Sequence, residues 1–187
     1  MYFMPLADIK SAQAAIKIIA LLSLVIAAST GAQAKAGNRI AQTGVVTRVI
    51  DGDTVWVQVQ GRDKPLKVRI EGIDAPEICQ PGGAMAQTAL KNLVMGQSVT
   101  VTTRAHDDFG RTVGSLHMQG QDLARWMVAN GHAWVYSFRS KNGPYSSEFA
   151  RAQADRRGLF ADAGAQEPRA FRKIHGSCHI SAYRPTK

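Results

Sequence analysis

Cysteine is scarce in this chain, because among its 187 residues only Cys79 and Cys178 carry a thiol. The five histidines do not stand at the short, regular spacings of a zinc site, so the sequence does not indicate one. The two cysteines either remain free or form one disulfide in an oxidising compartment. Such a disulfide would close a loop of about a hundred residues and hold the carboxy-terminal tail beside Glu77. The sequence leaves both alternatives open.

Long hydrophobic runs are also missing. The apolar run near the amino terminus, Ile18 to Ala28, has eleven residues, which is too short to cross a bilayer comfortably. It follows two lysines and precedes Ala32-Gln33-Ala34, which offers small residues at the positions that a signal peptidase reads. We therefore expect residues 1–34 to be a signal peptide and the protein to be exported, to the periplasm or the medium. An uncleaved anchor is the alternative.

Acidic residues are outnumbered, with 14 against 23 basic residues and a formal net charge of +9. Removal of the signal peptide would leave 21 basic and 13 acidic residues, or +8. This balance favours polyanions such as nucleic acid, although a solvated basic surface is an equally good explanation of charge alone. We expect a monomer that has no stable membrane association once the signal peptide is cleaved.

Carboxylates and one guanidinium follow two neighbouring predicted strands. Alternating apolar residues predict strands at residues 54–60 and 66–73. Asp53 stands at the start of the first strand, Arg69 lies within the second, and Asp74 and Glu77 come just past its end. Carboxylates brought together repel one another unless a cation lies among them, so this arrangement indicates a divalent metal held by oxygen ligands, Ca²⁺ or Mg²⁺.

The remaining elements are predicted from periodicity, turn residues and helix caps. After a leader at 35–42, the sequence predicts one domain at 43–160 and a basic tail at 161–187. Further strands are expected at 44–50, 98–104 and 111–118, and helices at 84–94, 122–130 and 146–157.

Three spaced motifs carry a family resemblance. They are Ile50-Asp-Gly-Asp-Thr54, Arg69-Ile-Glu-Gly-Ile-Asp-Ala-Pro-Glu77 and Phe109-Gly-Arg111. In this order, over roughly residues 43–160, the chain resembles the staphylococcal nuclease family, or thermonucleases. The resemblance implies an α+β fold, a five-stranded OB-fold β-barrel with three α-helices.

The resemblance also implies roles for single residues. It assigns a Ca²⁺ ion to Asp53, Asp74 and the backbone carbonyl of Ala75, and the role of general base to Glu77. Arg69 and Arg111 correspond to the two arginines that grip the scissile phosphate. Many relatives carry Thr in place of Ala75, but a backbone ligand survives that change.

Some of these residues have ordinary structural alternatives. Asp51 is more simply explained as the first residue of an Asp-Gly turn, and Arg111 could pair with Asp107 instead of a phosphate. Three aromatic residues are candidates for substrate binding. Phe109 stands where family members often carry Tyr, and it keeps the ability to stack on a base. Tyr136 and Tyr145 are as well explained by packing in the core.

These observations predict an exported Ca²⁺-dependent endonuclease that hydrolyses the phosphodiester bonds of DNA and RNA and leaves 3′-phosphate products. Single-stranded or otherwise accessible substrate is expected. One alternative is a non-catalytic nucleic-acid-binding OB-fold module. Another is an exported metal-binding protein without a role in nucleic-acid chemistry.

Overall fold

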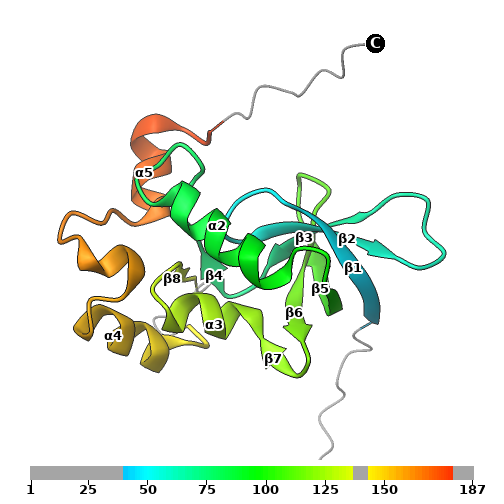
Figure 1. Ribbon diagram of the computed structural model, residues 1–187. Coiled ribbons are helices and arrows are strands. Elements are labelled where there is room, and N and C mark those ends of the chain that lie inside the picture. The colour runs from blue at the N-terminus through cyan, green and yellow to red at the C-terminus, as the bar shows by residue number, and fades with distance from the viewer. Residues whose placement is uncertain (1–39, 137–142, 179–187) are drawn as a thin grey trace, which may run out of the picture. The chain divides into compact units, whose positions relative to one another are not determined.

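The computed structural model describes residues 40–136 and 143–178 (Figure 1). The predicted signal peptide, most of the predicted leader and the end of the tail lie outside these ranges. Within the ranges, no helix combines the length and the apolar character needed to cross a membrane.

Five strands form a closed barrel: β1 (Ala41–Val49), β2 (Thr54–Val59), β3 (Leu66–Ile70), β5 (Ser98–His106) and β6 (Thr112–Met118). Neighbours in the order β3-β2-β1-β5-β6 pair antiparallel, and a parallel pairing between β3 and β6 closes the ring. The predicted α+β barrel is confirmed. A two-residue strand, β7 (Gln121–Asp122), pairs antiparallel with the end of β6.

Alternation along the strands sorts side chains between the barrel interior and its outer surface. In β2, Val55, Val57 and Val59 are buried, while Trp56 and Gln58 remain partly exposed. In β3, the buried residues alternate with Lys67 and Arg69, which therefore face outward. The site thus begins on the outer surface of the barrel, above a core that burial of apolar side chains stabilises.

The described residues contain four α-helices rather than the three predicted: α2 (Gly83–Val94), α3 (Leu123–Ala129), α4 (Ser146–Ala154) and α5 (Pro168–His175). Asp122 caps α3, because its side chain accepts a hydrogen bond from the Arg125 amide. Helix α5 lies within the predicted tail. The sequence analysis did not identify it, because it has only eight residues.

The third strand ends earlier than predicted. It stops at Ile70 because the chain turns at Gly72, where φ is +80°. The next two residues form β4 (Ile73–Asp74), which pairs with β8 (Trp134–Val135) in a second, two-stranded sheet. Asp74 is therefore fixed by a backbone pairing of its own, opposite Trp134.

Candidate active site

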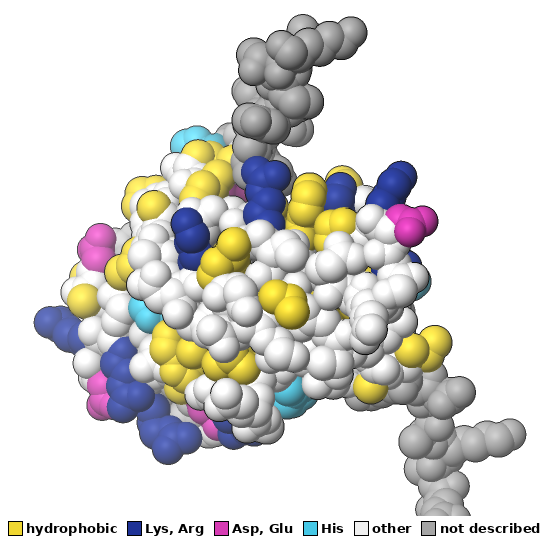
Figure 2. All heavy atoms as spheres, turned by 45° about the vertical axis from the view of Figure 1, so that its right-hand side comes forward, with side chains coloured by type: hydrophobic (Ala, Val, Ile, Leu, Met, Phe, Trp, Pro, Cys, Tyr) yellow, Lys and Arg dark blue, Asp and Glu magenta, His cyan; other side chains and the backbone are white. Residues whose placement is uncertain are grey.

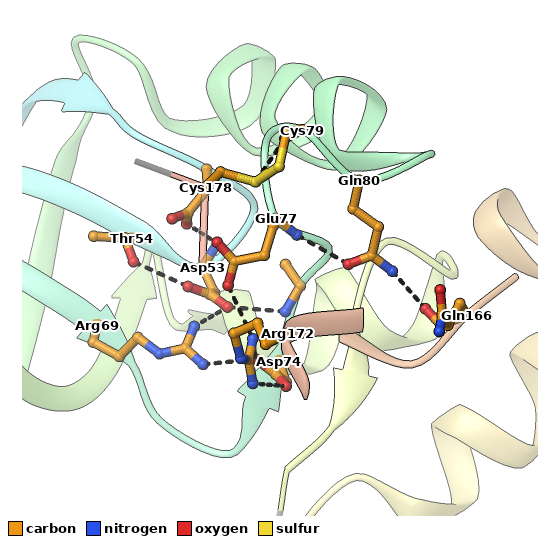
Figure 3. A network of polar contacts seen from close by, with 12 residues as sticks. Asp53, Thr54, Arg69, Asp74, Glu77, Cys79, Gln80, Gln166, Arg172 and Cys178 are labelled. Carbon is orange, nitrogen blue, oxygen red and sulfur yellow. Dashed lines mark hydrogen bonds and ion pairs between the residues drawn. A yellow bond between two sulfur atoms is a disulfide. The ribbon is translucent and has the colours of Figure 1, made fainter. Parts of the chain in front are cut away.

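Asp53 is held in a tight turn between β1 and β2. The Asp53 amide donates to the Asp51 carboxylate at 2.9 Å, so the structure shows the turn role for Asp51. The Asp53 carbonyl accepts from the Ile70 amide at 2.8 Å, which ties the turn to β3. Asp53 is only 4% exposed, and its carboxylate accepts hydrogen bonds from the Thr54 hydroxyl at 3.0 Å and from the Ala75 amide at 2.8 Å (Figure 3).

Arg69 joins the two predicted aspartate ligands. Its guanidinium forms an ion pair with Asp53 through Nη1 and bonds to Asp74 Oδ1 through Nη2 at 3.0 Å (Figure 3). Burial lowers the pKa of Arg69, although the Asp74 charge opposes that shift, and a guanidinium remains charged at any ordinary pH. Because one cationic group reaches both carboxylates, Asp53 and Asp74 face the same position.

These residues fit a bound Ca²⁺ ion by the chemistry of their donor atoms. Asp53 and Asp74 offer carboxylate oxygens, and Ala75, whose amide binds Asp53, offers a carbonyl. In the described ranges, no three His, Cys, Asp or Glu side chains lie close enough together to hold a metal ion. Arginine side chains occupy the carboxylate oxygens instead, so a metal would have to displace them.

Glu77 lies on the loop between β4 and α2. The Gln80 side chain accepts from the Glu77 amide at 3.3 Å, and the Gln80 amide donates to the Glu77 carbonyl at 2.8 Å. The Glu77 side chain is 21% exposed. The Glu77 backbone is therefore fixed, while its carboxylate remains partly open to solvent. The carboxylates of Glu77 and Asp74 also share one hydrogen-bonding partner.

That shared partner is Arg172 of α5, a residue that the sequence analysis did not identify. Its Nη1 donates to Asp74 Oδ1 and to Glu77 Oε1, both at 3.1 Å, and its Nη2 donates to Asp74 Oδ2 at 2.8 Å (Figure 3). The hydrogen bonds to Asp74 raise the pKa of Arg172. The sequence feature that could have indicated this contact is the cysteine pair, since Cys79 follows Glu77 closely and Cys178 follows Arg172 in the tail. The structure forms the Cys79–Cys178 disulfide, with a Cα–Cα distance of 5.9 Å.

Arg111 lies close to Arg69 but is bound to Asp107. Its Nε donates to Asp107 Oδ2 at 2.7 Å, and its amide donates to Oδ1 at 2.9 Å. Burial tends to raise the pKa of Asp107, but these bonds lower it. The charge of Arg111 also lowers the pKa of Arg69, because like charges repel.

Comparison with known proteins shows the family of this chain. The family described as Staphylococcal nuclease homologue matches residues 67–162. The chain belongs to the staphylococcal nuclease family. It is 36% identical over 126 residues to an uncharacterized endonuclease of Escherichia coli O157:H7, covering 67% of this chain and 81% of that protein.

Two further relatives of this staphylococcal nuclease homologue are also similar over most of their length. A micrococcal nuclease of Shigella flexneri is 35% identical over 141 residues, which cover 70% of this chain and 80% of that protein. Protein ParB of Escherichia coli is 33% identical over 167 residues, which cover 82% and 88%.

The three candidate aromatics of this family member differ in accessibility. Phe109 is 82% exposed, and the Arg111 guanidinium lies 5.5 Å from its ring centre. Tyr136 is 41% exposed, and its amide donates to the Gly72 carbonyl. Tyr145 is only 7% exposed, and its hydroxyl donates to Asp122 at 2.9 Å. Phe109 and Tyr136 can therefore reach a ligand, whereas burial favours a packing role for Tyr145.

Proposed function

We propose that this protein is an exported, Ca²⁺-dependent endonuclease that hydrolyses phosphodiester bonds of DNA and RNA and leaves 3′-phosphates. The family and its relatives support a nuclease function. The observation that carries the finer proposal is the bridge from Arg69 to both Asp53 and Asp74. It supports the proposal because both carboxylates are directed at one cationic group, and this guanidinium could also bind a phosphate.

The binding roles divide between the carboxylates and the arginines. Asp53, Asp74 and the Ala75 carbonyl would hold Ca²⁺, which when bound neutralises charge on the phosphate and activates a water molecule. Arg69 and Arg111 would release their carboxylate partners and bind the non-bridging phosphate oxygens. Their planar forks suit this task because each can donate two parallel hydrogen bonds.

Glu77 would act as the general base. It would accept a proton from the attacking water as the water oxygen bonds to phosphorus and the bond from phosphorus to the 5′-oxygen breaks. The leaving oxygen takes a proton and becomes a 5′-hydroxyl, while the phosphate stays on the 3′ side. The partial exposure of Glu77 is consistent with access for water.

The basic surface of the protein supports a single-stranded or accessible polyanionic substrate. Basic side chains gather in separate groups on the face drawn in Figure 2, and acidic side chains are fewer there. The exposed ring of Phe109 beside Arg111 could stack on a base next to the bound phosphate. The disulfide supports the proposed export, since such bonds persist in oxidising compartments. A monomer remains our proposal.

The test is cleavage of denatured DNA and RNA by purified Glu77→Gln and Arg69→Ala variants, with Ca²⁺ and then with a chelator. Loss of a general base or of a phosphate-binding donor should lower turnover by about 10²–10⁴-fold. The products should carry 3′-phosphates, and chelation should abolish cleavage by the wild type.

Matched controls are Asp63→Asn and Arg62→Ala, which change exposed residues in the connection between β2 and β3, at the far end of these strands from Asp53 and Arg69. Both should cut like the wild type, and thermal unfolding should show that all variants fold. Full activity of either site variant would contradict the catalytic assignment. Salt-sensitive binding of DNA without cleavage by the wild type would favour the non-catalytic binding module.

A further inference from the structure

Helix α5 reaches the acidic site although it is poorly equipped to stand alone. It has eight residues, begins with Pro168 and buries Phe171. A helix this short is marginal in water without tertiary contacts. Its position therefore depends on what it touches, and Arg172 supplies its polar contacts to the site.

Two tethers bracket the helix. Before it, the Gln166 carbonyl accepts from the buried Gln80 side chain at 2.6 Å, and after it, Cys178 is bonded to Cys79. Both anchors, Gln80 and Cys79, lie on the loop that carries Glu77 (Figure 3). Such tethers keep Arg172 at a high effective concentration near the carboxylates even when its own bonds break.

The Arg172 contact uses the atoms that the proposed reaction needs. Its guanidinium bonds to both oxygens of Asp74 and to Oε1 of Glu77. A dication on Asp74 would meet a positive charge a few ångströms away, and Glu77 cannot accept a proton through a lone pair that Arg172 occupies. Because the Arg172 side chain is 28% exposed, it has a path away from the site.

We propose that Arg172 is an internal cation of the acidic site, which competes with the divalent metal for Asp74 and Glu77 and must move before the site can act. Helix α5 then blocks the site of its own chain by holding Arg172 against Asp74 and Glu77. This inference rests on the proposed function, because it assumes that these carboxylates bind Ca²⁺. It predicts that the wild type binds Ca²⁺ more weakly than a protein in which the same carboxylates lack the Arg172 side chain.

The test compares Ca²⁺ binding and stability in Arg172→Ala. Titration calorimetry should give about tenfold tighter Ca²⁺ binding than in the wild type, since a competing charge-assisted contact is lost. In chelator, the variant should unfold at a lower temperature, because Asp74 and Glu77 lose a partner. Ca²⁺ should raise its melting temperature more than that of the wild type. A purely structural role for Arg172 would weaken both metal binding and stability.

The matched control is Arg169→Ala, which removes the same charge from an exposed position on α5. It should leave Ca²⁺ affinity unchanged. Arg172→Lys keeps the charge without the planar fork and should give an intermediate affinity; it also serves if the alanine variant does not fold.

Equal Ca²⁺ affinity in the wild type and all foldable Arg172 variants would overturn the proposal. If the wild type still cleaves DNA with Ca²⁺, the proposed function survives that result. If neither the wild type nor the variants bind Ca²⁺ or cleave DNA, both proposals are wrong.

Discussion

His132 carries an unusual buried atom. Its Nδ1 is the buried side-chain atom that lacks a hydrogen-bond partner in the described ranges, and its ring packs 5.6 Å from that of Trp126. Burial lowers the pKa of His132 from its ordinary value of 6.5. The unfolded chain therefore binds a proton at higher pH than the folded protein does, so stability is fully present above pH 6.5 and falls as the pH drops through the folded-state pKa.

Replacing this histidine should flatten that dependence. We expect the melting temperature of the wild type to fall between pH 7 and pH 5, and that of His132→Phe to fall less, by roughly a few degrees. The exposed His106→Phe is the control and should follow the wild-type profile. Parallel profiles for wild type and His132→Phe would show that His132 does not set the pH dependence.

Residues of the candidate site differ in how far the sequence could predict them. Asp53, Arg69 and Asp74 come from adjacent strands and turns, so strand alternation and motif spacing predicted that they lie close together. Arg69 indeed pairs with both aspartates. Arg172 meets Asp74 across 98 residues. No local pattern reports such a contact, and only the cysteine pair indicated that the tail returns to Glu77.

At the scale of elements, the start of α2 sets the position of the Glu77 loop. A Cβ on Gly83 would lie 1.9 Å from the Glu77 carbonyl oxygen, which is backbone and cannot turn aside. The close approach lets the first turn of the helix pack directly on the loop. Glycine is thus required here by space rather than by an unusual φ.

A methyl group at this position should push the Glu77 loop away from the site. Gly83→Ala is expected to lower the free energy of unfolding by about 1–3 kcal/mol and to reduce cleavage of denatured DNA. Thermal unfolding and the cleavage assay measure the two effects. Gly164→Ala is the control, because its nearest contact is a flexible side chain at 3.3 Å. Unchanged activity in Gly83→Ala would mean that the loop can shift without cost to the site.

The elements themselves were predictable to different degrees. Barrel strands were predicted because Val and Ile alternate with polar residues along them, and α2 was predicted because its apolar residues share one face. The end of β3 and the presence of α5 were not. A left-handed glycine at Gly72 redirects the chain. Helix α5 has only eight residues, and a disulfide just after it and the ion pair of Arg172 with Asp74 help to hold it in place. No local sequence pattern indicates those two contacts.

At the scale of the molecule, the disulfide joins the first half of the domain to its end. Cys79 and Cys178 are 99 residues apart, and the chain between them includes β5, β6 and the helices α2 to α5. A cross-link around so long a loop restricts the unfolded chain strongly in the chain-entropy account. It should therefore stabilise the whole domain as well as hold α5 near the site.

Reduction separates these two effects. Loss of the bridge, by reductant or in a Cys79→Ser/Cys178→Ser double variant, should lower the free energy of unfolding by about 2–5 kcal/mol, measured by denaturant titration. Reductant should not change the double variant further, which makes it the control. An unchanged unfolding midpoint, together with faster hydrogen exchange confined to α5, would show that the bridge serves as a local tether. The chain-entropy effect would then be offset by residual structure in the reduced, unfolded chain.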